Sequence, residues 1–290
     1  MQICRDLPSL RAATAALRAD GRRLGLVPTM GALHDGHLAL VAAARAAGAG
    51  AVAASIFVNP LQFAANEDLA RYPRDEAGDL AKLRAAGCDL VWMPPVEAMY
   101  PPGAATTVEV AGPSAGFEGD ARPGHFRGVA TVCCKLFLQS GAEIAAFGEK
   151  DWQQLQVVTR MAADLDIPVR ILPVATVREA DGLAMSSRNR YLTTAERATA
   201  PLLHRRMTEA AAAIAAGAPI APTLERARAA LCDAGFAPDY LAAVEAATLR
   251  PLDAPSRDTP MRLLAAARLG AVRLLDNIPL GAPAGTPGPG

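Results

Sequence analysis

Short apolar runs alternate with longer helical patterns over residues 24–176. Runs without a polar face, such as AVAASIFV at 51–58, predict strands that are buried on both sides. These strands are expected at residues 24–27, 51–58, 89–93, 144–147 and 169–176. Helices are expected between them, at residues 37–47, 75–86, 126–139 and 152–165. The alternation predicts an α/β fold with a parallel sheet covered by helices on both faces.

The pattern changes after about residue 180. Helices are predicted at 194–216 and 223–234, and strands at 240–245, 261–267 and 271–275. Pro201 must lie in the first turns of its helix or kink it, and Pro222 lies near the start of the next one. The last two strands flank Leu269 and Gly270, which is a hairpin signal. This region therefore predicts a smaller α+β domain.

These patterns divide the chain into three parts. We expect an α/β domain over residues 1–177 and a smaller α+β domain over 178–280. The tail GAPAGTPGPG at 281–290 has no large apolar residue to anchor it, so we expect it to be disordered.

Composition narrows the class of partner. Of the 290 residues 51% are apolar, which is enough for a substantial core, and the 29 basic and 29 acidic residues cancel. No block of basic residues supports a nucleic-acid or anionic-membrane partner. The chain shows neither a membrane-length apolar stretch nor the apolar core of a signal peptide, so we expect a cytoplasmic protein without a membrane span.

The cysteines form no CxxC pair. They are Cys4, Cys88, Cys133, Cys134 and Cys232. We interpret them as reduced, mostly buried thiols. A catalytic thiol is the alternative, although no neighbouring residue suggests a base to activate it.

The stretch PTMGALHDGH at 28–37 follows a predicted strand and leads into a helix. Gly31 and Gly36 would let the backbone approach a ligand, and the helix N-terminus offers free N–H groups to an anion. The glycine spacing matches a P-loop, but His37 stands where lysine is required, so a Walker A site is excluded. His34 and His37 are candidate phosphate donors. Two alternatives remain: a metal pair, which lacks helical spacing and an obvious third ligand, or a simple turn cap.

Two further stretches follow predicted strands. In SIFVNPLQF (55–63), Gln62 could hold a hydroxyl or carboxylate at the carboxyl end of a strand, or it could cap a turn. In FGEKDWQQL (147–155), Lys150 is suited to phosphate oxygens. The alternative is an ordinary helix start, since Glu149 and Asp151 suit its dipole. Gln153 and Gln154 would add amides to the same crevice or its rim.

The fourth stretch, READGLAMSSRNRYL at 178–192, lies where the two patterns meet. Ser186, Ser187 and Arg188 place two hydroxyls beside a guanidinium, which is a suitable clamp for a phosphate chain. A solvated interdomain loop is the alternative. Four such stretches favour one nucleotide site, in which catalysis rests on positioning and on stabilising charge at phosphorus.

Long ordered motifs over roughly residues 23–278 resemble the pantoate–β-alanine ligase family, whose members are HIGH-type nucleotidyltransferases. The motifs are VPTMGALHDGH, SIFVNPLQF, NEDLARYPR, HFRGVATV, FGEKDWQQL, VREADGLAMSSRNRYL and LLDNI. The resemblance implies a Rossmann-like N-terminal domain and a smaller C-terminal one. It implies ATP-dependent condensation of (R)-pantoate with β-alanine to pantothenate, a coenzyme A precursor, through a pantoyl adenylate. It also implies that AMP and pyrophosphate are released, that Mg²⁺ takes part, and that the protein is a homodimer in the cytoplasm.

The resemblance also assigns residues. It implies ATP binding by Met30, Gly31, Ala32, Leu33, His34, Asp35, Gly36, His37, Gly148, Glu149, Lys150, Asp151, Val177, Met185, Ser186, Ser187 and Arg188. It implies catalytic roles for His34, His37, Lys150, Ser186, Ser187 and Arg188. It names no side chain as a metal ligand and leaves the ligands of Mg²⁺ open. Gln62 is assigned to pantoate and β-alanine, and Gln154 to pantoate, with Asn59, Asp79 and Arg122 as further candidates.

The implied chemistry leaves two roles open for His37. It could stabilise charge on the α-phosphate, or it could donate a proton. Two rival functions also fit parts of the pattern. One is an adenylyltransferase that keeps AMP on its product, although amides such as Gln62 suit a hydroxy acid better than a phosphorylated substrate. The other is a nucleotide-binding regulator without turnover, which would be expected to have lost Lys150, His37 or Arg188.

Overall fold

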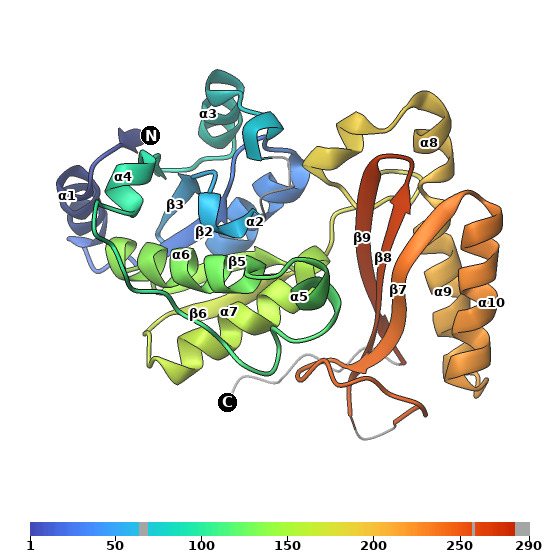
Figure 1. Cartoon of the computed structure of the whole chain (residues 1–290). Coiled ribbons are helices and arrows are strands. Elements are labelled where there is room, and N and C mark those ends of the chain that lie inside the picture. Colours follow the sequence, from blue (N-terminus) through green and yellow to red (C-terminus); the bar gives the residue numbers. More distant parts are fainter. Residues whose placement is uncertain (64–68, 257–258, 282–290) are drawn as a thin grey trace. The chain divides into compact units, whose positions relative to one another are not determined.

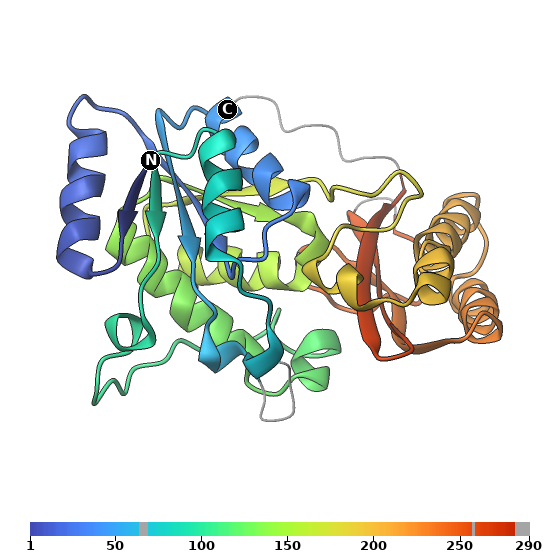
Figure 2. The ribbon, with the colours of Figure 1, turned by 90° about the horizontal axis from the view of Figure 1, so that it is seen from above.

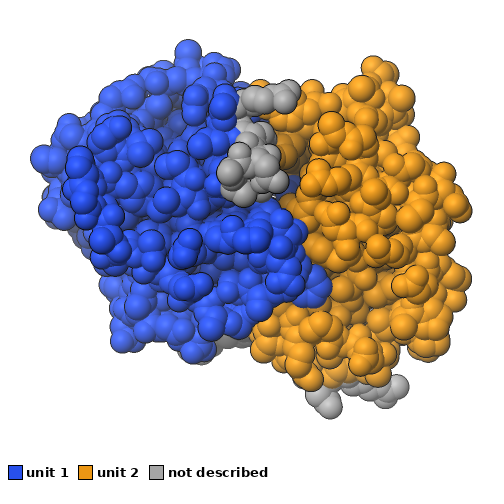
Figure 3. All heavy atoms as spheres, viewed as in Figure 1, with its two compact units in different colours: residues 1–177 blue, residues 178–290 orange. Residues whose placement is uncertain are grey.

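The computed structural model describes residues 1–63, 69–256 and 259–281. It divides into two compact units, Met1–Val177 and Arg178–Gly290, which Figure 3 colours separately. Nearly all of the tail predicted to be disordered, residues 282–290, lies outside the described residues.

Unit 1 is built on a six-stranded sheet in which every neighbouring pair is parallel (Figures 1 and 2). The strands are β1 (Gln2–Cys4), β2 (Leu24–Thr29), β3 (Ala51–Ile56), β4 (Leu90–Trp92), β5 (Ile144–Gly148) and β6 (Arg170–Val174), in the order β1-β4-β3-β2-β5-β6. The parallel sheet predicted from the apolar runs is therefore confirmed. The short edge strand β1 was not predicted, because its three residues carry no run of their own.

Helices cover both faces of this sheet (Figure 1). They are α1 (Leu7–Arg18), α2 (Asp35–Ala46), α3 (Glu76–Ala85), α4 (Val96–Met99), α5 (Phe117–Ala121), α6 (His125–Ser140) and α7 (Trp152–Asp164). Single 3₁₀ turns are η1 (Pro60–Gln62), η2 (Leu69–Arg71) and η3 (Glu149–Asp151). Helix α1, which the pattern did not predict, is capped by Asp6, whose side chain accepts from the Ser9 N–H at 2.8 Å.

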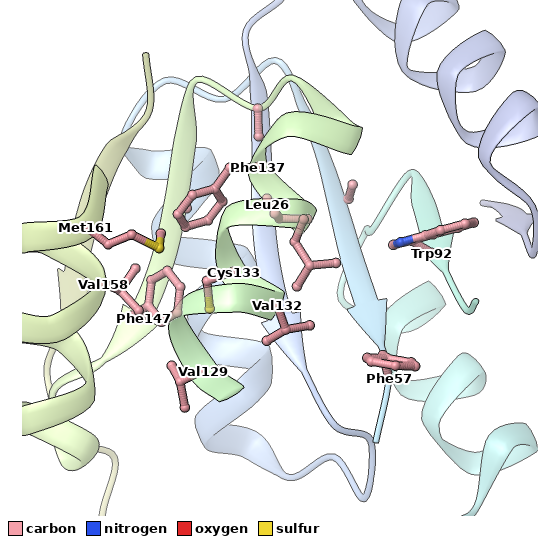
Figure 4. Packing of buried hydrophobic residues seen from close by; sticks show 14 of the residues in the cluster. Leu26, Phe57, Trp92, Val129, Val132, Cys133, Phe137, Phe147, Val158 and Met161 are labelled. Carbon is pink, nitrogen blue, oxygen red and sulfur yellow. The ribbon is translucent and has the colours of Figure 1, made fainter. Parts of the chain in front are cut away.

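Two hydrophobic clusters pack against the two faces. Alternate residues of β2 supply both, because Leu26 contributes to the cluster under α6 and α7 whereas Val27 contributes to the one under α2 and α3. Figure 4 shows the first cluster, in which Phe137 and Phe147 pack edge to face with ring centroids 6.2 Å apart. Strands with two buried faces explain why the apolar runs lack alternation.

The strand order places a topological switch point between β2 and β5. From β2 the chain passes to β3 and β4 on one side, and later to β5 and β6 on the other. Because all six strands are parallel, the loops after β2, β3 and β5 leave the sheet at the same edge. Ligands of open α/β sheets bind at this edge, beside the switch point.

Unit 2 has a three-stranded antiparallel sheet, with α9 and α10 packed on one face of it (Figures 1 and 2). Its elements are η4 (Ser187–Tyr191), α8 (Thr194–Thr199), α9 (Leu202–Ala215), α10 (Ile220–Asp233), β7 (Phe236–Glu245), β8 (Met261–Leu269) and β9 (Val272–Leu280). Pro201 divides the single helix predicted over 194–216 into α8 and α9. The hairpin turn consists of Gly270 and Ala271, one residue later than predicted, because Leu269 pairs with Val272.

Candidate active site

A buried carboxylate holds the loop between β2 and α2. Asp79 of α3 is 2% exposed and accepts the backbone N–H groups of Ala32 and Leu33, both at 2.8 Å. Lys82, one turn later, donates to the Leu33 carbonyl at 2.7 Å. Gly31 has φ +83°, and a Cβ there would lie 2.9 Å from Asp79 Oδ2. Asp79, a candidate lining residue in the sequence, therefore fixes the loop backbone through its side chain.

The two histidines of this loop lie at the N-terminus of α2. Their ring centroids are 4.1 Å apart. The His34 backbone N–H points at His37 Nδ1 at 3.3 Å, so a neutral His37 carries its proton on Nε2. His34 Nδ1 is buried and has no hydrogen-bond partner among the described residues. Its place at the helix N-terminus, facing the His37 backbone N–H, is one that a water molecule or an anionic ligand can occupy.

Both imidazoles are neutral at physiological pH. Burial lowers the pKa of His37 to about 3, and the neighbouring His34, Lys150 and Lys82 act in the same direction. Burial, with Lys150 and Lys82, lowers the pKa of His34 to about 4. The histidines can therefore donate hydrogen bonds without carrying charge, and the cationic side chains that act on both of them are Lys150 and Lys82.

These pKa values predict an acid-sensitive fold. In the unfolded chain both histidines titrate near 6.5, so below that pH the unfolded state takes up protons that the folded state refuses. The free energy of unfolding should fall between about pH 6.5 and pH 4, by at most about 1.4 kcal/mol per pH unit for His37. Denaturant unfolding at several pH values gives the free energy of unfolding as a function of pH. Below pH 6.5 this free energy should fall less steeply with pH in His37→Ala than in the parent protein. An equal fall in both proteins would contradict the lowered pKa of His37.

Lys150 reaches the same region from the neighbouring strand. Strand β5 ends at Gly148, and Lys150 follows in η3, with its side chain 19% exposed and Nζ 3.5 Å from Asp151 Oδ1. Strand β5 pairs with β2, and α2 packs against β5. The structure thus brings together His34, His37 and Lys150 beside the loop where the sequence analysis expected an anion site.

A polar network fixes the amide of Gln62 in η1. Asn59 is fully buried; its Oδ1 accepts from the Leu61 N–H at 3.2 Å and its Nδ2 donates to the Gly128 carbonyl at 3.1 Å. These backbone groups define the orientation of the Asn59 amide, so its Nδ2 must meet the oxygen of Gln62, at 2.9 Å. Tyr100 completes the network by donating to Asn59 Oδ1 at 2.9 Å. Gln62 therefore keeps its Nε2 as the donor end.

Two side chains support the Gln62 backbone. Its carbonyl accepts from His125 Nδ1 at 2.9 Å and from Arg122 Nη2 at 3.2 Å. Arg122 Nη1 lies 3.1 Å from His125 Nε2, and because a guanidinium only donates, Nε2 must be the acceptor. This close approach of α6 requires Gly128, since a Cβ there would lie 2.1 Å from the Leu61 carbonyl oxygen.

The sequence analysis did not expect Tyr100, or the support that His125 gives. The HFRG stretch was the available signal, because it places a histidine, an arginine and a helix glycine together.

The neighbouring glutamines of α7 differ in their surroundings. The Nε2 of Gln153 donates to the carbonyls of Pro113, Ala115 and Gly116 at 3.0–3.2 Å, and its oxygen accepts from the Glu118 N–H at 3.0 Å. All of its amide is thus used to hold the chain before and into α5. The expectation that Gln153 faces a ligand crevice is wrong, whereas Gln154 is half-buried and stays a candidate.

The MSSR segment, residues 185–188, lies in unit 2 directly before and within η4. Ser186 caps this 3₁₀ helix, and its Oγ accepts the Arg188 N–H at 3.3 Å. All four side chains are half-buried. Val177, the remaining candidate, is the last residue of unit 1.

In the described part of the chain, a metal held by side chains would show as a cluster of ligands, and thiol catalysis as an activated cysteine. No group of three or more His, Cys, Asp or Glu side chains there could hold a metal ion. The cysteines are free, and burial raises the pKa of Cys88 to about 11 and that of Cys133 to about 12. These thiols stay protonated and are poor nucleophiles.

Comparison with known proteins identifies the family. The family model described as pantoate-beta-alanine ligase matches residues 2–279. The chain belongs to the pantoate–β-alanine ligase family. A pantothenate synthetase of Acidiphilium cryptum (strain JF-5) is 61% identical over 279 residues, which are 96% of this chain and 99% of that protein. The family match favours a ligase over the adenylyltransferase and the regulator.

Solved structures of the family have the same fold. A pantothenate synthetase from Thermus thermophilus gives a TM-score of 0.90 at 46% identity, covering 97% of this chain and 100% of that one. A pantoate-beta-alanine ligase from Francisella tularensis, described as complexed with beta-gamma ATP and beta-alanine, gives 0.79 at 29% identity, covering 96% and 97%. The Rossmann-like unit with a smaller α+β unit, as the resemblance implied, is thereby confirmed.

A membrane span was not expected from the sequence. Among the helices that the structure describes, none combines the length and the apolar character needed to cross a bilayer.

Proposed function

We propose that this protein joins (R)-pantoate to β-alanine, with ATP as the energy source and a pantoyl adenylate as the intermediate. The observation that carries the proposal is the convergence of His34, His37 and Lys150 at the β2/β5 switch point, in a chain of the pantoate–β-alanine ligase family. The Francisella relative, described as complexed with beta-gamma ATP and beta-alanine, supports ATP and β-alanine as substrates. AMP and pyrophosphate are the other products.

In the proposed adenylation, the N-terminus of α2 holds the phosphates of ATP. His37 donates from Nε2, His34 donates from its unpaired Nδ1, and Lys150 neutralises charge as the carboxylate of pantoate attacks the α-phosphorus and pyrophosphate leaves. Neutral imidazoles suit this arrangement because they do not repel the nearby lysine. The substrate carboxylate is itself the nucleophile, which agrees with the inert, protonated thiols. We assign His37 to electrostatic stabilisation rather than to proton transfer.

The proposal extends to Mg²⁺ and to the MSSR segment. Mg²⁺ is commonly held by one or two carboxylates together with substrate phosphates, so the lack of a three-residue cluster among the described side chains is compatible with it. Asp151, beside Lys150, is the carboxylate that fits this role. Ser186, Ser187 and Arg188 would bind the phosphate chain through two hydroxyls and a planar guanidinium. The homodimer and the cytoplasmic location stay predictions.

The network around Gln62 determines which end of its amide is left for the proposed acid substrate. Because its oxygen is held by Asn59, Gln62 offers N–H groups, which suit the hydroxyl and carboxylate oxygens of pantoate and the carboxylate of β-alanine. A phosphorylated substrate would instead call for further basic side chains.

Gln62→Glu should therefore weaken pantoate binding. The new carboxylate has no donor for the substrate and repels its charge, whereas Asn59 Nδ2 keeps an acceptor. We expect KM for pantoate to rise about ten- to a hundredfold, the effect of losing a hydrogen bond to a charged group, with KM for ATP changing much less. Steady-state kinetics with each substrate varied in turn check this. Leu61→Gln, at an exposed neighbouring position, serves as the control. An equal rise in KM for pantoate and in KM for ATP would argue against a contact between Gln62 and pantoate.

The overall reaction tests the proposed function. The protein is incubated with ATP, (R)-pantoate and β-alanine, and free AMP and the amide product are followed together. One AMP per pantothenate is expected. AMP retained on a product would instead support an adenylyltransferase, and no turnover would support a regulator.

A further inference from the structure

A buried ion pair in unit 2 anchors the chain just ahead of the MSSR segment. Asp276 lies on β9, where its side chain is 3% exposed. Arg178 binds it through two N–H···O bonds, Nη1 to Oδ2 at 2.7 Å and Nη2 to Oδ1 at 2.9 Å. Burial alone would raise the pKa of Asp276, but contacts from His204 and Arg178 hold it below its usual range. The pair is therefore ionised, and its two-pronged geometry is strongly directional.

Arg178 also closes the turn that follows it. Its Nη1 donates to the Gly182 carbonyl at 3.1 Å, and its backbone forms an antiparallel bridge with Ala184. Within the turn, the Glu179 N–H donates to the Leu183 carbonyl at 2.8 Å. Both ends of residues 178–184 are thus held by one arginine, which Asp276 fixes to the sheet.

The turn is connected directly to the MSSR segment. The Asn189 side chain donates to the Ala184 carbonyl at 3.1 Å, and its backbone N–H donates to the Ser186 carbonyl at 3.0 Å. Ser186 in turn accepts the Arg188 N–H. A continuous series of hydrogen bonds therefore runs from Asp276 to the hydroxyl and guanidinium residues of the proposed phosphate clamp.

The turn formed by residues 178–184 also packs closely against α9. Gly182 has φ +93°, and a Cβ there would lie 3.1 Å from the His204 ring. The ring is close to Asp276 as well, with His204 Nδ1 3.5 Å from its Oδ2. The turn is thus confined by α9 and β9 together.

We propose that Arg178 and Asp276 are positioning residues, which set the orientation of Met185–Arg188 for the triphosphate. The inference rests on the proposed role of this segment in ATP binding. A buried ion pair contributes little net stability compared with apolar residues of similar size, but it does fix geometry. That property is what a phosphate clamp needs, because small displacements of a binding group reduce the rate steeply.

Two near-isosteric variants test the proposal. Asp276→Asn keeps the size of the side chain but removes its charge, and Arg178→Lys keeps the charge but removes the planar fork. The readouts are pantoate-dependent exchange of labelled pyrophosphate into ATP, and KM for each substrate. We expect KM for ATP to rise or exchange to slow by about ten- to a hundredfold, the effect of a lost charged hydrogen bond. KM for pantoate should stay within about twofold, since its proposed contacts lie in unit 1.

Asp239→Asn is the matched control. It removes the same charge from another ion pair of this sheet, Asp239 on β7 with Arg273 on β9, where Arg273 Nε lies 2.6 Å from Asp239 Oδ2. Normal KM for ATP and normal exchange in the folded Arg178→Lys and Asp276→Asn variants would overturn the proposal. So would equal losses in Asp239→Asn, or a failure of both test variants to fold, since the pair would then serve the fold. Absence of exchange in the parent protein would instead refute the proposed function.

Discussion

Replacing Lys150 by alanine is expected to slow formation of the pantoyl adenylate by about a hundred- to a thousandfold, the usual effect of removing one transition-state contact. Lys150 follows β5 at the switch point and lies near enough to His34 and His37 to lower the pKa of both. A cation at the start of a helix is not favoured by the helix dipole, so its position suggests an anionic ligand. Removing it takes away charge that would neutralise the phosphates.

The measurement is the rate of pyrophosphate exchange, with thermal unfolding measured alongside. Lys135→Ala on α6 provides the control, because Lys135 is not among the charges that shift the pKa of His34 or His37. Loss of the partly exposed Asp151 contact should by itself lower the free energy of unfolding by at most about 1 kcal/mol. An unchanged exchange rate would remove Lys150 from the mechanism, and a large fall in the melting temperature would indicate a structural role.

His37→Ala should slow formation of the pantoyl adenylate by a similar factor. The pH dependence of that loss of activity identifies the role of the imidazole. With its Nδ1 facing the His34 N–H, a neutral His37 has one N–H, on Nε2, which would donate to the α-phosphate in the proposed site. Loss of one such donor costs about 2.7–4 kcal/mol in the transition state. Because burial lowers its pKa to about 3, His37 is neutral in the free enzyme at neutral and mildly acidic pH.

The pH dependence of kcat/KM for ATP reports ionisations of the free enzyme, so it separates the two roles of His37. If His37 is a neutral donor, the ratio of parent to His37→Ala activity should stay constant from pH 8 down to pH 6. A cationic acid with an ordinary pKa near 6.5 would make this ratio change across the same interval. A pH-dependent ratio would therefore return His37 to the role of proton donor.

Much of unit 1 was predictable because its signals are local. Strands buried on both faces produce continuous apolar runs. A glycine loop between a strand and a helix is also a local signal for an anion site, and that site stays a prediction. Strand β9 was predicted too short because its apolar run is interrupted. Its second half contains Asp276 and Asn277, which break the apolar pattern although both are buried in the sheet.

The support around the site was less predictable, because it depends on residues distant in sequence. Tyr100 reaches Asn59, and His125 reaches Gln62, through bonds that no local pattern announces. Gln153 and Gln154 are adjacent and chemically identical, yet only the tertiary position of the α5 region shows that Gln153 serves the fold. Asp79 likewise carried no sign that it would accept two backbone N–H groups.

Exchange of pyrophosphate in the absence of the amine tests the central claim most directly. The protein is supplied with ATP, (R)-pantoate and labelled pyrophosphate, without β-alanine. A site with phosphate donors and no acyl-carrying nucleophile should form pantoyl adenylate reversibly, so label should enter ATP, and it should not do so when pantoate is omitted. If no label enters ATP while the same preparation makes pantothenate once β-alanine is added, the adenylate does not form ahead of the amine and the account is contradicted.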